Sequence, residues 1–249
     1  MKPRIIKATT RTPDGGDMVL YQHDRDFLIK VDGEDLMLSS QHESELELAR
    51  LGCAHLVEHK APSILLGGLG MGYTLRQALE MLSPHTEVVV SELLDDVIGW
   101  NHEFLGKLNN HPLKDERVDL RAGNIVELIS RSRNRFDAIL LDIDNGPGAF
   151  SYSGNSRLYG HKGIWACRRA LRKNGCLAVW SAGPCRAYER LLLHCGFHVR
   201  RYHAPAFKGA KSLARLIWVA AADSSVLPPG GREPRRHKSM VRKGRGPAK

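Results

Sequence analysis

The sequence has few of the features that mark membrane, secreted or metal-binding proteins. No apolar run in its 249 residues approaches the roughly 20 that a membrane-spanning helix needs. The first 17 residues lack the apolar stretch of a secretory signal. None of the five cysteines has CxxC spacing, and the twelve histidines include no HExxH motif. We therefore expect a soluble cytoplasmic protein with reduced thiols, no membrane contact and no bound metal.

Aromatic residues are also scarce, at 6%, which argues against a surface that stacks nucleic-acid bases. Positive charge is plentiful but uneven, because residues 223–249 carry +6 of the net charge of +10. This segment is rich in Pro, Gly and basic residues and lacks apolar periodicity. It predicts a disordered basic tail that can make weak contact with nucleic acid.

The first 60 residues predict a small N-terminal unit. Residues 1–17 are polar and rich in turn formers, which favours disorder. Beyond them, short apolar runs separated by turn signals such as Asp32-Gly33 predict a β-hairpin region. Its predicted strands are 18–21, 26–31 and 35–38. Leucines at helical spacing then predict one helix within residues 43–59.

Residues 61–222 alternate between strand and helix patterns and predict a single α/β domain. The predicted strands are 63–66, 87–90, 117–120, 136–141, 176–180, 197–202 and 213–220. The predicted helices are 74–82, 95–105, 125–130, 159–172 and 184–195. Strands with continuous apolar character indicate a mostly parallel, seven-stranded sheet covered on both faces, with the last two strands forming a pair. Ligands of such sheets bind beyond the carboxyl ends of the strands.

A glycine-rich turn follows the first predicted strand of this domain. Its candidate ligand-binding residues are Gly68, Leu69, Gly70, Met71 and Gly72. Glycine lets the backbone turn sharply and approach a ligand, and the next helix offers free N–H groups. The spacing fails the G-x-G-x-x-G pattern of nicotinamide-binding proteins and suits a nucleoside whose amino-acid portion lies against the loop. A glycine turn made only for packing would look the same.

Polar residues after the next two strands can complete a nucleoside site. Glu92, followed by Leu93, ends the second strand, where an acid can accept hydrogen bonds from both ribose hydroxyls. A solvated glutamate at a helix start is the alternative. Gly123 and Asn124 follow the third strand, and the Asn124 amide can read the edge of adenine. A helix N-cap is an equally good role for Asn124, and the two roles are compatible.

The fourth strand, 136–141, ends in a loop that begins with Asp142 and holds Asp144 and Asn145. A carboxylate at the end of a buried strand is costly unless it has a partner. We predict that this loop binds a cationic amine and that Asp142 accepts its proton. A capped turn would explain Asp144 or Asn145, but it explains Asp142 less well. Trp180, at the end of the fifth strand, either walls the acceptor pocket or packs in the core.

Taken in order, these segments resemble the spermidine synthase family, whose members transfer an aminopropyl group from decarboxylated S-adenosylmethionine to an amine. ILLGGLGMG is similar to the family's glycine loop, and FDAILLDIDNGPG is similar to the strand that carries its catalytic aspartate. SELLDDVI and RAGN look like its ribose-side and adenine-side segments. LYGHKGIWACRRALRKNGCLAVWSA looks like its tyrosine-bearing helix and fifth strand. The resemblance covers about residues 18–222.

The resemblance implies an N-terminal β region (1–60) and an S-adenosylmethionine-dependent methyltransferase-like Rossmann domain (61–222), ahead of the tail. It implies that Asp142 is catalytic and also contacts the nucleoside, and that Glu92 binds the ribose. Tyr159 would lie beside the acceptor with Asp144, Asn145 and Trp180. The donor would be decarboxylated S-adenosylmethionine or S-adenosylmethionine, the acceptor a small amine and the pathway polyamine biosynthesis, with no metal. A homodimer fits this family.

Around the amine site the sequence departs from the family pattern. Met71 stands where the family has an aspartate, and Leu36 stands where it has a glutamine. The segment 45–47, Glu-Leu-Glu, replaces Tyr-His-Glu. An acid at position 71 would pair with the ammonium of the decarboxylated donor and repel a carboxylate. We therefore expect weaker discrimination against intact S-adenosylmethionine.

Three functions remain open from the sequence. The leading one is transfer of an aminopropyl or related alkyl group to an amine. An S-adenosylmethionine-dependent methyltransferase would use the same site and differ only in which carbon beside the sulfur faces the nucleophile. A non-catalytic nucleoside- or RNA-binding protein directed by the basic tail is the third.

Overall fold

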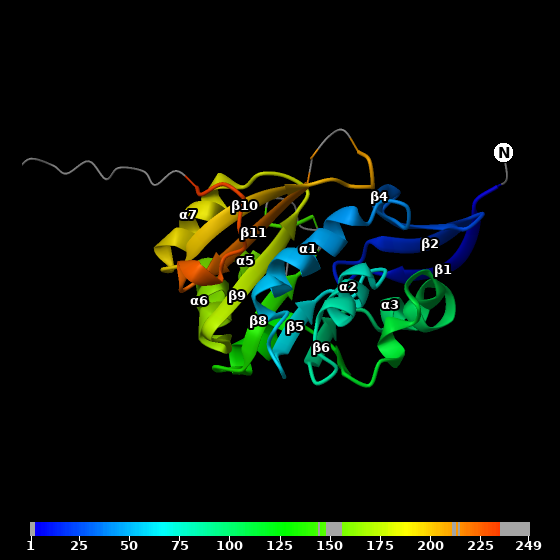
Figure 1. Cartoon of the computed structure of the whole chain (residues 1–249). Coiled ribbons are helices and arrows are strands. Elements are labelled where there is room, and N and C mark those ends of the chain that lie inside the picture. Colours follow the sequence, from blue (N-terminus) through cyan, green and yellow to red (C-terminus); the bar gives the residue numbers. More distant parts are fainter. Residues whose placement is uncertain (1–2, 144, 148–155, 211–212, 214, 235–249) are drawn as a thin grey trace, which may run out of the picture.

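The computed structural model describes residues 3–143, 145–147, 156–210, 213 and 215–234, which form two sheets with helices around them (Figure 1). The N-terminal sheet is antiparallel, in the order β1-β2-β3-β4. Its strands are Ile5–Arg11 (β1), Asp17–His23 (β2), Asp26–Val31 (β3) and Glu34–Leu38 (β4). The larger sheet has seven strands in the order β10-β11-β9-β8-β5-β6-β7. Its strands are Ser63–Gly67 (β5), Glu87–Glu92 (β6), Val118–Ala122 (β7), Phe136–Leu141 (β8), Leu171–Ser181 (β9), His198–Ala204 (β10) and Arg215–Ala221 (β11).

Helices connect the strands in the alternating manner that the sequence predicts. The α-helices are Glu43–Cys53 (α1), Tyr73–Met81 (α2), Asp95–Trp100 (α3), Ile125–Arg131 (α4), Ser156–Tyr159 (α5), His161–Ala170 (α6) and Arg186–His194 (α7). Short 3-10 or π turns are Ala54–Leu56 (η1), Asn101–Leu105 (η2), Gly106–Asn109 (η3), Pro112–Lys114 (η4) and Ser224–Val226 (η6). Only β11 runs against its neighbours, so the predicted mostly parallel, methyltransferase-like Rossmann fold is confirmed.

The large sheet is buried on both faces, which explains its continuous apolar strands. Along β5, Ile64 and Leu66 pack on one face under α1 and α2, which cross in front of the sheet in Figure 1. Leu65 points to the other face, where α4, α6 and α7 supply the partners. Alternate residues of one strand therefore belong to two different cores. Four of the five cysteines are buried in this domain, and all five are free.

The N-terminal sheet is larger than the predicted hairpin region. β1 pairs with β2 over residues that the sequence analysis assigned to disorder, so that expectation is wrong. The reason is that β1 is an exposed edge strand, in which Ile5 is 58% and Ile6 57% exposed. The sequence of such a strand resembles that of a polar loop. Met18 and Leu20 of β2 anchor the sheet in a third core with α2 and α3.

The last described residues are also more ordered than the sequence predicts. Leu227 is buried, and the Tyr202 hydroxyl donates to the carbonyl of Pro228 at 2.6 Å. Arg232 forms a backbone bridge with Arg201 of β10. The predicted disordered tail from 223 onward therefore begins with a segment packed on the sheet. Its most basic part, 235–249, lies outside the described residues.

Two element boundaries differ as well. The predicted helix 159–172 is split into α5 and α6, and β9 begins at Leu171 rather than at 176. The pairing of β8 with β9 shifts register between Phe136 and Ala138, which accommodates the polar residues at the start of β9. Sequence patterns locate such irregular ends poorly because the pairing is non-local.

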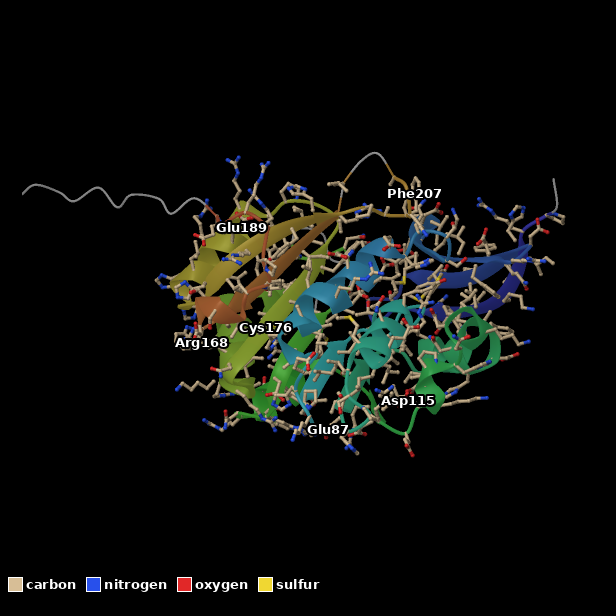
Figure 2. All side chains as sticks on the ribbon, viewed as in Figure 1. Glu87, Asp115, Arg168, Cys176, Glu189 and Phe207 are labelled. Carbon is tan, nitrogen blue, oxygen red and sulfur yellow. The ribbon has the colours of Figure 1, made fainter. Side chains whose placement is uncertain are left out.

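The order of the large sheet reverses between β5 and β8, so the loops after these two strands diverge to opposite sides. Such a switch point is where ligands bind in open α/β sheets. The amino edge of the sheet is closed instead by ion pairs. Glu87 pairs with Arg135 at 3.0 Å, and Asp115 pairs with Arg117 at 2.7 Å; Figure 2 labels both acids. Among the described residues, no helix has the length and apolar character to cross a bilayer.

Candidate active site

A cavity of about 390 Å³ lies at the carboxyl edge of the large sheet, within the size range of small-molecule sites. Six residues of the predicted nucleoside set line it: Gly68, Gly70, Glu92, Leu93, Gly123 and Asn124. Three residues of the predicted amine set also line it: Asp142, Asn145 and Trp180. Residues of the N-terminal sheet, among them Leu36 and Met37, form the facing wall. The structure thus brings most of the predicted site together.

The glycine loop is pressed against the end of β8. Gly68 has a φ of +87°, and a Cβ there would lie 2.2 Å from the carbonyl oxygen of Asp142. Only glycine combines that backbone angle with that approach. The Gly68 N–H donates to Ser91 at 2.9 Å, and the Asp142 N–H donates to Gly67 at 2.8 Å. The loop is therefore held between β6 and β8 with its backbone facing the cavity.

Glu92 connects the end of β6 to this loop. Its Oε2 accepts from the Leu69 N–H at 2.8 Å, and its Oε1 accepts from the Leu94 N–H at 3.0 Å. Burial raises the pKa of Glu92, although these backbone hydrogen bonds act in the opposite direction. The backbone N–H groups of Leu93 and Gly70 also act on this carboxylate, which lines the cavity.

Asn124 is the N-cap of α4, as one of its two predicted roles requires. Its Oδ1 accepts from the Val126 N–H at 2.9 Å. This bond fixes the orientation of the amide and leaves its NH₂ group as a donor at the cavity wall. Gly123 precedes it with a φ of +135° and donates its N–H to the Glu92 carbonyl at 2.7 Å.

Asp142 is joined to α1 and α2 by a side-chain network. The Thr74 hydroxyl donates to Asp142 Oδ2 at 2.5 Å and lies 3.3 Å from the carbonyl of Glu45. Burial raises the pKa of Asp142 to about 6, while the Thr74 hydrogen bond lowers it. Burial and the charge of Asp142 raise the pKa of Glu45 to about 8. Two neighbouring acids of this kind favour a single negative charge on the pair at neutral pH.

Three residues were missed as site residues by the sequence analysis: Glu45 and Arg215 line the cavity, and Thr74 donates to Asp142 beside it. Glu45 was noted only as a departure from the family pattern, and Thr74 was taken as part of a helix. Arg215, at the start of β11, also lines the cavity. Its guanidinium lies 5.7 Å from the ring centroid of Trp180. The antiparallel pair predicted for the last two strands was the available signal, because it brings the first residue of β11 to the ligand edge.

Four predicted residues do not line the cavity. Leu69 and Met71 are buried with their side chains in the core, and Gly72 is the left-handed N-cap of α2. Tyr159 is buried and donates its hydroxyl to the carbonyl of Ile143 at 3.2 Å, behind the cavity wall. Asp144 lies outside the described residues.

No metal site is seen within the described part of the chain. No three His, Cys, Asp or Glu side chains there lie close enough to hold an ion. Asp142 instead accepts from the Thr74 hydroxyl, and Glu92 accepts from backbone N–H groups.

Comparison with known proteins gives relatives of one kind, although no family model matches the chain. A polyamine aminopropyltransferase of Nitrosomonas europaea is 32% identical over 125 residues, 49% of this chain and 35% of that protein. The enzyme of the same name from Prochlorococcus marinus is 26% identical over 129 residues, 51% of this chain and 43% of that protein. The match thus spans less than half the length of either relative.

Solved structures extend the likeness of the fold to nearly the whole chain. The spermidine synthase of Thermotoga maritima superposes with a TM-score of 0.71 at 16% identity, over 90% of this chain and 75% of that one. A spermidine synthase in complex with the transition-state analogue AdoDATO superposes with a TM-score of 0.69, also at 16% identity, over 90% and 76% of the chains. The chain is therefore similar in sequence to polyamine aminopropyltransferases over about half of its length, and similar in fold to spermidine synthases.

Proposed function

We propose that this protein transfers an aminopropyl or related alkyl group from a sulfonium nucleoside, decarboxylated S-adenosylmethionine or S-adenosylmethionine, to an amine. The observation that carries the proposal is the position of Asp142 at the switch point, in one cavity with the glycine loop, Glu92 and Asn124. Relatives named for aminopropyl transfer favour this reaction over methyl transfer. Binding of nucleic acid without catalysis has less support, because the acids of the cavity suit a cation.

The donor would lie along the carboxyl edge of β5, β6 and β7. Glu92 would accept hydrogen bonds from the ribose hydroxyls, and the Asn124 amide would donate to the adenine edge. Gly68 and Gly70 would let the sulfonium end approach the backbone closely. Leu69, Met71 and Gly72 would act through the shape of the loop rather than through their side chains.

The acceptor would lie between the donor, Asp142 and Trp180. Asp142, ionised at neutral pH, would attract the ammonium form of the amine and take its proton. The freed nitrogen lone pair would then attack the carbon beside sulfur as the carbon–sulfur bond breaks in line, which releases a neutral thioether. Glu45, whose pKa is raised to about 8, would add no second negative charge beside Asp142. Holding both reactants in line supplies much of the acceleration.

Product analysis tests the proposal directly. The protein is incubated with either donor and a panel of amines, and the nucleoside product is identified by mass. Methylthioadenosine indicates aminopropyl transfer from the decarboxylated donor, whereas S-adenosylhomocysteine indicates methyl transfer. Absence of any nucleoside product with both donors and the whole panel would refute the proposal.

The partners, assembly and location of the protein are part of the same proposal. We propose a small-molecule amine as the acceptor partner, a homodimer as the assembly and the cytoplasm as the location. Tyr159 would support the acceptor site through the Ile143 backbone, and Asn145 would contact the acceptor. The chain would divide functionally into 1–60, 61–222 and a basic tail, whose end would contact nucleic acid weakly.

A further inference from the structure

Arg215 is the one cation among the described residues that line the cavity. The charged groups around it are the acids Asp35, Glu45, Glu92 and Asp142. A guanidinium offsets part of this negative charge, but it also repels the ammonium and sulfonium groups of the proposed ligands. The position of Arg215 therefore calls for an explanation in terms of the ligand.

The topology of the sheet brings this residue to the ligand edge. β11 runs antiparallel to β9, and Leu216 pairs with Ser181, the last residue of β9. In turn, Leu141 at the end of β8 pairs with Val179 of β9. The start of β11 thus lies level with the ends of β8 and β9. Because neighbouring strands are roughly 4.8 Å apart, the backbone of Arg215 is about 10 Å from that of Asp142, within reach of one small ligand.

The guanidinium is not engaged by an ion pair within the described part of the chain, although its charge lowers the pKa of Glu45 and so opposes the larger effect of burial. Neither an ion pair nor a hydrogen bond of its side chain is found there, whereas Asp35 pairs with Lys30 at 2.8 Å. Its neighbour is the ring of Trp180, which holds it at the cavity wall. The indole N–H of Trp180 is buried and has no acceptor among the described residues either. Arg215 therefore offers donors without acceptors to the cavity, whose acids suit an ammonium.

We propose that Arg215 binds a carboxylate of the substrate, so that the cavity takes a zwitterionic ligand with an ammonium group near Asp142 and a carboxylate near Arg215. Guanidinium and carboxylate match in shape and form two parallel hydrogen bonds. This inference rests on the proposed function and narrows its substrate class. Two sources fit the chemistry: the amino-acid end of intact S-adenosylmethionine, or an acceptor that is itself an amino acid.

Arg215 gives a structural basis for binding intact S-adenosylmethionine, whereas the expectation from the sequence was based on Met71. That expectation assumed that residue 71 faces the donor, but the Met71 side chain packs in the core with Met18 and Tyr73. Discrimination between the two donors must therefore come from residues that reach the cavity. Arg215 does so, and it acts by attracting a carboxylate rather than by removing a repulsion.

Matched ligand pairs test the proposal by calorimetry. S-adenosylmethionine is compared with its decarboxylated form, and ornithine is compared with putrescine in the presence of methylthioadenosine. Each pair differs only in one carboxylate. The variants are Arg215→Gln, Arg215→Lys and, as a control, Arg190→Gln, which removes an exposed charge on α7. We expect Arg215→Gln to lower the affinity for the carboxylated member of one pair at least tenfold. The affinity for the member without the carboxylate should stay the same or increase. Arg190→Gln should change neither.

The outcomes separate the two claims. An effect confined to the nucleoside pair assigns the carboxylate to the donor, and one confined to the amine pair assigns it to the acceptor. If wild type and Arg215→Gln bind both members of each pair with unchanged ratios, the carboxylate site is refuted while the nucleoside site stands. If no nucleoside binds to wild-type protein, the proposed function itself fails. Melting curves verify folding, and Arg215→Lys, which keeps the charge, serves if the glutamine variant does not fold.

Discussion

Replacing Glu45 by glutamine should flatten the pH dependence of stability. The carboxyl of Glu45 has its pKa raised from 4.5 to about 8 by burial and by the charge of Asp142. Between these values the unfolded chain loses a proton that the folded protein keeps. The free energy of unfolding therefore falls as pH rises through this window, and the glutamine variant, which cannot ionise, lacks that fall.

The most informative interval is pH 6 to 8. Asp142, with its pKa raised to about 6, completes its ionisation in the lower half of this interval, so Glu45 dominates the upper half. Two pH units correspond to at most about 3 kcal/mol. Because Glu45 lines a cavity that solvent can enter, the measured value should be smaller. The glutamine variant should thus gain stability relative to wild type by about 1–3 kcal/mol between pH 6 and 8.

Urea unfolding at pH 6, 7 and 8 measures this difference. The diagnostic quantity is the difference in unfolding free energy between variant and wild type at each pH, because contributions common to both proteins cancel in it. Glu47→Gln is the matched control, since Glu47 lies on the same helix and pairs with Arg50 at 3.4 Å outside the cavity. A difference between Glu45→Gln and wild type that stays constant from pH 6 to 8 would refute the raised pKa of Glu45.

Four further predictions follow from the site and the packing. Glu92→Ala should weaken nucleoside binding by about 1.5–3 kcal/mol, or tenfold to a hundredfold, and calorimetry that shows unchanged affinity in a folded variant would remove Glu92 from the site. Asp142→Asn should keep donor binding but lose turnover, because an amide cannot take the proton; turnover near that of wild type would exclude the catalytic role. A chain that ends at residue 234 should melt like the full chain, whereas one that ends at 222 should melt lower because Leu227 leaves its core; equal melting temperatures would contradict that packing. Met71→Asp should destabilise the fold by burying a charge rather than retune donor choice, and a stable variant with altered donor preference would show that residue 71 reaches the ligand.

Much of the fold was predictable because its signals are local. Continuous apolar strands that alternate with helical patterns indicate a parallel sheet, since only a strand buried on both faces needs such a sequence. Strand β1 was not predicted because the sequence of an exposed edge strand shows neither a continuous apolar run nor a helical pattern. The segment after Asp223 escaped for a different reason: its order depends on contacts with Tyr202 and Arg201, which its own composition does not reveal.

The candidate site divides in the same way. The sequence by itself determined the glycine loop, Glu92, Asn124 and Asp142, because each directly follows a strand and parallel strands bring their carboxyl ends to one edge. It did not determine which side chains of the loop face the ligand, and the structure turns Met71 into the core.

Only the tertiary structure decided what surrounds Asp142. The hydrogen bond from Thr74 spans 68 positions in sequence, and Glu45 and Arg215 come from a helix and a strand whose own patterns are ordinary. Their importance arises from proximity: burial of two acids side by side separates their pKa values, and an antiparallel last strand brings a cation to the same cavity. Proximity of this kind is a property of packing, because it depends on how distant elements are placed, whereas the residues that follow each strand are specified by the chain itself.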